Sequence, residues 1–234
     1  MTSDREGRTD QSRDTLFNGA IVCRQPRSGY RYSIDAVLLA HFVNIRKKEH
    51  ILDLGTGCGV IGLILLHRFK DRISSVVGYE KQENLVKIAR QNVAENSLED
   101  RFLIIQCIVE KIDENFQPES FSTVISNPPF YIKGAGRISR DPERETARHL
   151  TDTSLDCFIK AAAYCVKNKG KIVLIYPSGM LASLLAAMKK YRIEPKRLGL
   201  VYSYPEVGKE AKLAIVEGIK NGGTGLRVVA PFFN

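Results

Sequence analysis

From about residue 50 onward, short runs rich in apolar and β-branched residues alternate with longer amphipathic stretches. This alternation predicts parallel strands joined by right-handed helical crossovers, which is the pattern of an α/β sheet. Strands are expected at residues 50–54, 75–80, 102–107, 121–126 and 170–176. Helices are expected between and after them, at residues 60–69, 83–95, 155–167 and 179–190.

Two further strand candidates follow, at residues 197–204 and 210–221, separated by a short turn. A parallel return between them would need a dozen or more residues, so their closeness predicts an antiparallel hairpin at one end of the sheet. The pattern therefore predicts a seven-stranded, mostly parallel sheet. Residues 225–233 are expected to form an extended tail.

The first 48 residues have a different pattern. Residues 1–14 are polar, without apolar periodicity, and are expected to be a disordered tail. Residues 15–48 are expected to form a cap on the core, which spans residues 49–234 of the same single domain. A helix is expected in the cap, with Ser33 or Asp35 as its N-cap.

Composition narrows the class of protein. With 44% apolar residues, 234 residues can fill one sizeable core. No apolar run approaches the roughly 20 residues that cross a bilayer, and the start lacks the apolar segment of a secretory signal. The five cysteines and four histidines show no metal-ligand spacing. We therefore expect a cytoplasmic protein without a membrane segment and without a metal.

The chain is basic, with a formal net charge of +9. Such a charge attracts polyanions and favours nucleic acid as a partner, although it can also serve solubility. Within residues 131–148, five basic residues accompany three acidic ones and two glycines. This segment is expected to be a loop that either orders on RNA phosphates or is simply solvated.

A glycine-rich segment follows the first core strand. It reads Asp53-Leu54-Gly55-Thr56-Gly57-Cys58-Gly59, with glycines where the backbone must turn sharply and let a ligand approach. The spacing differs from a dinucleotide fingerprint, and Asp53 would repel a pyrophosphate. An acid at this position suits instead the positively charged amino acid part of S-adenosylmethionine (SAM). The alternative is an ordinary strand-to-helix turn.

A second acid strengthens the prediction of a cofactor site. Glu80 ends the next strand, where a carboxylate can accept two hydrogen bonds from ribose hydroxyls. Together Asp53, the three glycines and Glu80 predict a SAM site at the carboxyl ends of the strands.

The tetrapeptide Asn127-Pro128-Pro129-Phe130 follows the fourth strand and is expected at the same sheet edge. An amine conjugated to a ring or carbonyl is a poor nucleophile. The Asn127 side-chain oxygen and the Pro128 carbonyl could bind its two hydrogens and favour a pyramidal nitrogen. The prolines stiffen the loop, and Phe130 offers a surface on which a base can stack. The alternative is a rigid turn, which Asn-Pro commonly starts.

These elements together resemble class I SAM-dependent amino-methyltransferases. Three further segments, at residues 30–40, 147–149 and 195–198, are similar to one subgroup, the bacterial tRNA1(Val) adenine-N6-methyltransferases, which modify the adenosine beside the anticodon. The resemblance covers roughly residues 16–233. Two positions depart from it: Ile108 stands where an acid usually meets the adenine of SAM, and Leu150 where the subgroup tends to have an acid.

The resemblance implies a seven-stranded, Rossmann-like class I methyltransferase fold that uses SAM to methylate adenosine N6 in RNA, first of all tRNA. It implies that the target base is held by Asn127, Pro128, Pro129 and Phe130. It implies that SAM is held by Asp53, Gly55, Thr56, Gly57, Gly59, Glu80 and Asn127, with Tyr32 and Asp35 in a leader that closes over SAM and the base. A plain amphipathic helix covering the sheet is the alternative for that leader.

Three other functions stay open. A protein-glutamine N5-methyltransferase would usually carry Asn-Pro-Pro-Tyr and an added helical substrate domain. A ribosomal RNA guanine-N2-methyltransferase also uses Asn-Pro-Pro-Phe, commonly with a duplicated domain. The third is a SAM- or RNA-binding module without catalysis, which Ile108 suggests and the complete tetrapeptide opposes.

Overall fold

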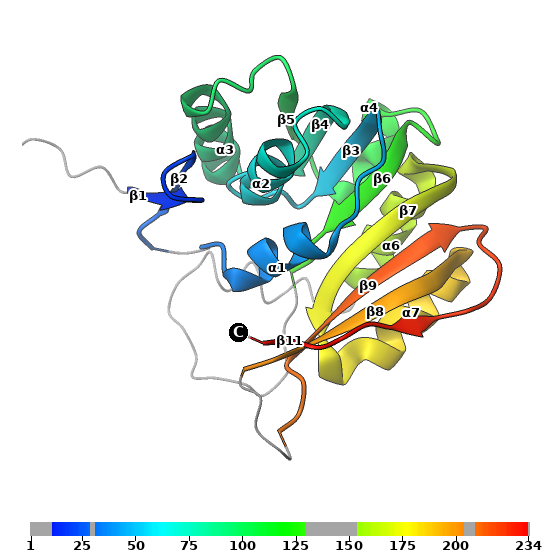
Figure 1. The fold of residues 1–234 in the computed structure, drawn as a ribbon. Coiled ribbons are helices and arrows are strands. Elements are labelled where there is room, and N and C mark those ends of the chain that lie inside the picture. The colour runs from blue at the N-terminus through cyan, green and yellow to red at the C-terminus, as the bar shows by residue number, and fades with distance from the viewer. Residues whose placement is uncertain (1–10, 29–30, 130–153, 204–208, 234) are drawn as a thin grey trace, which may run out of the picture.

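The structure is a computed structural model that describes residues 11–28, 31–129, 154–203 and 209–233 (Figure 1). The expectations for residues 1–10, Phe130, the 131–148 segment, residues 147–149, Leu150 and the turn at 204–208 lie outside the described residues.

A large mixed sheet forms the centre of the molecule (Figure 1). All seven predicted strands are present, in the order β5-β4-β3-β6-β7-β9-β8. Only β9 runs against its neighbours: it lies between β7 and β8 and is antiparallel to both, so the predicted hairpin is confirmed. The strands are β3 (Glu49–Leu54), β4 (Ile73–Glu80), β5 (Phe102–Gln106), β6 (Phe121–Ser126), β7 (Val166–Pro177), β8 (Ile193–Tyr202) and β9 (Leu213–Lys220).

The end of the chain extends this sheet. The expected extended tail contains two short strands, β10 (Arg227–Val228) and β11 (Phe232–Phe233), and both pair in parallel with β8. The Phe232 ring lies edge-on to Phe42 at a centroid distance of 6.0 Å, which joins the tail to the N-terminal cap.

Helices cover both faces of the sheet, because neighbouring strand residues point to opposite sides. Ile51 belongs to the core shared with α1, α2 and α3, whereas Leu52 belongs to the core shared with α4, α6 and α7. Figure 1 shows the first group in front of the sheet and α6 and α7 behind it. The helices are α1 (Ile34–Phe42), α2 (Val60–Arg68), α3 (Glu83–Glu95), α4 (Ile112–Asn115), α6 (Ser154–Cys165) and α7 (Leu181–Lys190), with 3-10 turns η1 (Val109–Lys111) and η2 (Ser178–Met180). No described helix has the length and apolarity that a membrane crossing requires.

The predicted cap contains a β-hairpin that the sequence pattern did not reveal. Strands β1 (Gln11–Leu16) and β2 (Ile21–Pro26) pair antiparallel and form what we call the N-terminal hairpin. The expectation of a disordered tail is therefore wrong for residues 11–14. The reason is that β2 buries Ile21 and Cys23 in the core, and β1 then pairs with it through backbone groups, which needs no apolar side chains.

Helix α1 begins after Ser33, as the sequence allowed. The Ser33 hydroxyl oxygen accepts the backbone N–H of Asp35 at 3.3 Å, so Ser33 is the N-cap and Asp35 lies in the first turn. A carboxylate in that turn also faces the positive end of the helix dipole.

Candidate functional site

The glycine loop (residues 55–59) joins β3 to α2 and has the left-handed backbone that its glycines predicted. Gly55, Gly57 and Gly59 have φ angles of 73°, 58° and 86°, and Gly59 is the N-cap residue of α2. Side chains are disfavoured at such angles. The N–H groups of Gly55 and Thr56 both donate to the Tyr79 carbonyl, at 2.7 and 3.1 Å, which ties the loop to the end of β4.

Asp53 lies fully buried near the end of β3. The Thr56 hydroxyl donates to its Oδ2 atom at 2.6 Å, whereas Oδ1 is buried without a hydrogen-bond partner among the described residues. Burial raises the pKa of Asp53 to about 7; the Thr56 hydrogen bond acts against this rise and the charge of Glu80 adds to it. A buried acceptor of this kind is costly unless something donates to it, which makes Oδ1 a candidate acceptor for a ligand.

Glu80 also supports the glycine loop, which the sequence did not predict. Its Oε2 atom accepts the Gly57 N–H at 3.1 Å, and its Oε1 atom accepts the N–H groups of Lys81 and Gln82, both at 2.9 Å. Burial raises the pKa of Glu80, while these backbone hydrogen bonds act in the opposite direction. Two carboxylate oxygens can accept about four hydrogen bonds, so Glu80 keeps capacity for a ligand hydroxyl.

The start of the proline-containing tetrapeptide lies at the same edge of the sheet as the glycine loop. Strand β6 pairs with β3 in parallel, with Leu54 opposite Ser126, and the Ser126 hydroxyl donates to the Leu54 carbonyl at 2.7 Å. Asn127 and Gly55 are thus the next residues of two paired strands. The Oδ1 atom of Asn127 is buried and has no hydrogen-bond partner among the described residues. Pro128 is buried and Pro129 half-buried.

The two leader residues are placed differently. Tyr32 is half-buried and packs against the core cluster that includes Cys58 of the glycine loop. Burial raises the pKa of Tyr32, and the nearby Cys23, Asp14 and Cys58 add to the rise. The backbone N–H of Asp35 donates to the Ser33 hydroxyl. Tyr32 thus packs on the core beside the loop, whereas within the described residues Asp35 makes no hydrogen bond to another residue of the predicted site.

The position that departs from the family lies at the end of β5. Ile108 is exposed, and it precedes the 3-10 turn η1. The adjacent Cys107 N–H donates to the Glu80 carbonyl at 2.9 Å, so Ile108 follows a residue that contacts the candidate cofactor site but has no polar side chain to offer it. Within the described ranges, we find no cluster of three or more potential metal ligands.

One residue of this region escaped the sequence reasoning. Asn92 is fully buried in α3, and its side-chain amide donates to the Cys58 carbonyl of the glycine loop at 2.8 Å. The signal was present in the sequence: Asn92 falls on the apolar stripe of an amphipathic helix, in line with Leu85 and Ile88, where a polar side chain needs a partner.

The fold and the site define a class I methyltransferase that uses SAM. The chain belongs to the family described as the methyltransferase small domain, whose sequence model matches residues 33–191. This membership confirms the expected fold, cofactor and enzyme class, a SAM-dependent N-methyltransferase.

Curated relatives carry one recurring name. The chain is 28% identical over 193 residues to the tRNA1(Val) (adenine(37)-N6)-methyltransferase of Aeromonas salmonicida, covering 81% of this chain and 77% of that protein. It is 26% identical over 193 residues to the protein of the same name from Bacteroides thetaiotaomicron, with the same coverage. The resemblance inferred from the motifs is thereby confirmed.

Solved structures share the fold. A protein described as a predicted O-methyltransferase from Agrobacterium tumefaciens superposes with a TM-score of 0.66 at 23% identity, over 85% of this chain and 86% of that one. A SAM-dependent O-methyltransferase from Thermotoga maritima gives a TM-score of 0.57 at 17% identity, over 85% and 69% of the two chains. At these identities the similarity concerns the fold alone.

Proposed function

We propose that this enzyme transfers a methyl group to the N6 amine of an adenosine in tRNA, in the anticodon loop of a valine tRNA. The names of its curated relatives support this acceptor. The observation that carries the proposal is the buried Asn127 Oδ1 atom beside the glycine loop, which has no hydrogen-bond partner among the residues that the structure describes. Such an atom suits an amine hydrogen of the acceptor.

The residues at the edge fit the cofactor. Asp53 Oδ1 is a buried acceptor with no partner in the described part of the chain and would receive the ammonium of the cofactor, while Glu80 would accept a ribose hydroxyl. The positive φ angles of the three glycines let the backbone turn sharply at this edge. SAM supplies the methyl group, on a positively charged sulfur. Gly55, Thr56, Gly57 and Gly59 would complete the cofactor site, with Tyr32 and Asp35 covering it.

The acceptor amine would be held by two oxygens. The exocyclic nitrogen of adenine has its lone pair spread into the ring, so its nucleophilicity rises when hydrogen bonds favour a pyramidal geometry. Asn127 Oδ1 and the Pro128 carbonyl would accept its two hydrogens and direct the lone pair. Pro129 would stiffen this segment and Phe130 would stack on the base. No strong base is required, because the methylated amine can lose its proton afterwards.

Charge supports a polyanionic acceptor. The net charge of +9 would raise the rate of encounter with RNA and make binding depend on salt. We include in the proposal that the basic segment 131–148 contacts RNA phosphates. Action on tRNA would place the enzyme in the cytoplasm.

The acceptor is tested by product identification. The protein is incubated with isotopically labelled SAM and total unmodified tRNA and ribosomal RNA, and the RNA is digested and its nucleosides are separated. Labelled N6-methyladenosine from the tRNA fraction is the expected result. Labelled N2-methylguanosine from ribosomal RNA would replace the proposed acceptor with the guanine alternative. In a parallel incubation with total protein as the acceptor and no label in RNA, labelled glutamine would replace it with the protein alternative.

The role of Asn127 is tested separately. Asn127→Ala removes one of the two acceptors, and removing a preorganised hydrogen-bond group costs about 100-fold or more in turnover. Binding of S-adenosylhomocysteine, measured by calorimetry, should stay close to wild type. Asp53→Ala is the matched variant, which should weaken cofactor binding instead. Near-wild-type turnover by Asn127→Ala would refute the proposed grip on the amine.

A further inference from the structure

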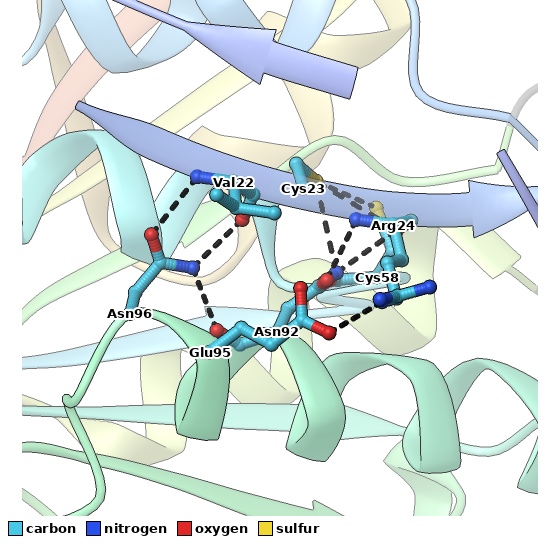
Figure 2. A network of polar contacts seen from close by, with 7 residues as sticks. All are labelled: Val22, Cys23, Arg24, Cys58, Asn92, Glu95 and Asn96. Atoms are coloured by element: carbon cyan, nitrogen blue, oxygen red, sulfur yellow. Dashed lines mark hydrogen bonds and ion pairs between the residues drawn. The ribbon is translucent and has the colours of Figure 1, made fainter. Parts of the chain in front are cut away.

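Two asparagines, Asn92 of α3 and its C-cap residue Asn96, hold the free edge of the N-terminal hairpin (Figure 2). Asn96 accepts the Val22 N–H at 3.0 Å and donates to the Val22 carbonyl at 2.7 Å. Asn92 accepts the Arg24 N–H at 2.7 Å and donates to the Arg24 carbonyl at 2.9 Å. Each side-chain amide therefore pairs with one residue of β2 as a neighbouring strand would, and the edge opposite β1 is satisfied without another strand.

The spacing of the two elements explains why two asparagines suffice. Residues two apart on a strand are separated by about 6.6 Å, and residues four apart on a helix by about 6 Å. Asn92 and Asn96 are four apart on α3, whereas Val22 and Arg24 are two apart on β2, so the two rows match. An ion pair between Arg24 and Glu95, at 2.5 Å, flanks the same contact.

Asn92 makes two further hydrogen bonds that Asn96 does not, one of them a long contact of 3.7 Å from its amide nitrogen to the Cys23 Sγ atom on β2. Its amide nitrogen also donates to the Cys58 carbonyl at 2.8 Å, and Figure 2 shows Asn92 between β2 and Cys58. Cys58 lies between Gly57 and Gly59 and is itself buried. The remaining donation of Asn96 goes to the Asn92 carbonyl at 2.7 Å, within its own helix. Asn92 is thus shared by the hairpin and the glycine loop, whereas Asn96 serves the hairpin and the helix end.

The Cys58 carbonyl needs this donor. A buried backbone acceptor without a partner costs about 1 to 3 kcal/mol, and a flexible glycine segment can avoid that cost by turning the carbonyl elsewhere. One residue earlier in the loop, the Gly57 N–H donates to the Glu80 carboxylate. Asn92 and Glu80 therefore hold two peptide groups of the loop, 58–59 and 56–57, with one peptide group between them.

We propose that Asn92 is a positioning residue for the cofactor site, and that it couples docking of the N-terminal hairpin to the conformation of the glycine loop. Because the one Asn92 amide binds both segments, the loop keeps its SAM-binding conformation only while β2 is docked on α3. A bound cofactor in turn stabilises the docked β2. This proposal rests on the use of SAM and not on the identity of the acceptor, so it stands even if the methylated nucleoside differs from N6-methyladenosine.

Asn92→Ala and Asn96→Ala form a matched pair, because both remove a clamp on β2 and only the first removes the donor to Cys58. We expect Asn92→Ala to weaken binding of S-adenosylhomocysteine by about tenfold or more, as the loss of one buried hydrogen bond implies. Asn96→Ala should change it by less than about twofold, the size of a few tenths of a kcal/mol. Thermal unfolding without ligand records the loss of stability in each variant. In kinetics with saturating RNA, Asn92→Ala should raise KM for SAM more than it lowers kcat.

Equal affinities of the two variants, or a wild-type affinity in Asn92→Ala, would overturn the proposal. If Asn92→Ala does not fold, Asn92→Ser is used at lower temperature, because its hydroxyl can retain one of the donations and leaves a smaller defect. The same affinity criterion applies to that variant.

Hydrogen exchange of the wild-type protein gives an independent test. Adding S-adenosylhomocysteine should slow exchange in the peptide covering residues 17–28, whose Arg24 amide is bound to Asn92. The protection should persist in Asn96→Ala and disappear in Asn92→Ala or Asn92→Ser. Unchanged exchange of this peptide in the wild type on adding the ligand would show that the hairpin and the loop are not coupled.

Discussion

The buried carboxyl of Asp53 predicts how the free enzyme responds to pH. Burial raises its pKa from 3.8 to about 7, so between these values the folded protein holds a proton that the unfolded chain has lost. The contribution of Asp53 to the free energy of unfolding is fully present below its pKa in the unfolded chain and is lost as pH rises through its pKa in the folded protein. The two pKa values differ by about three units, which corresponds to about 4 kcal/mol of stability at about 1.36 kcal/mol per unit.

The perturbation is Asp53→Asn, which removes the ionisation and can keep an oxygen for the Thr56 hydroxyl. Between pH 5 and pH 8, the two pKa values imply that the wild type loses about 2.5 kcal/mol relative to the variant. Asp53→Asn should therefore gain stability relative to the wild type as pH rises, although it binds the cofactor less well. Glu80 is present in both proteins, so its own titration largely cancels in the difference.

Urea unfolding of the ligand-free proteins at pH 5, 6, 7 and 8 measures this difference. Calorimetry with S-adenosylhomocysteine provides the second readout, because the ligand ammonium requires an ionised Asp53. Wild-type affinity should fall below about pH 7, and fall again above about pH 8 as the ligand amine loses its proton. A stability difference between wild type and variant that stays constant from pH 5 to pH 8 would refute the reasoning, since Asp53 would then be ionised throughout.

Two further predictions concern the core. Lys171 lies 3.1 Å from Glu49 in a mostly buried ion pair. Lys171→Met leaves the Glu49 charge buried and should lower the free energy of unfolding in urea by about 3 to 5 kcal/mol. Adding Glu49→Gln should recover part of this lost stability. A Cβ atom at Gly62 would lie 2.3 Å from the Phe102 ring, so Gly62→Ala should cost about 1 to 3 kcal/mol. Phe102→Leu in the same chain should relieve the clash, and a Gly62→Ala protein as stable as the wild type would contradict the packing described.

Much of the core could be predicted because its information is local. The run from Ile51 to Leu54 is apolar at every position except Asp53, as expected of a strand covered on both faces. The glycine spacing then fixed where that strand turns, and parallel pairing placed Asn127 at the same edge. Asp53, Glu80 and Asn127 were found by this reasoning, and the structure brings them to one edge through the register of β3, β4 and β6.

The N-terminal hairpin could not be predicted in this way. Residues 11–14 read Gln-Ser-Arg-Asp, without the alternation of a strand that has one buried face. The strand β1 exists because its backbone pairs with β2, and β2 in turn is held by asparagines 68 and 74 residues away along the chain. Neither partner is visible in a window of neighbouring residues.

The sequence alone determined the order of strands and helices, the edge at which the chemistry gathers and the types of side chain present there, since periodicity and turn residues act over a few positions. The tertiary structure decided which of those groups already have partners. One Asp53 oxygen binds Thr56 while the other has no partner among the described residues, Glu80 binds the Gly57 amide, and Asn92 binds the Cys58 carbonyl. Hydrogen bonds depend on distances of a few tenths of an ångström between segments distant in sequence, and only packing of the whole chain sets those distances.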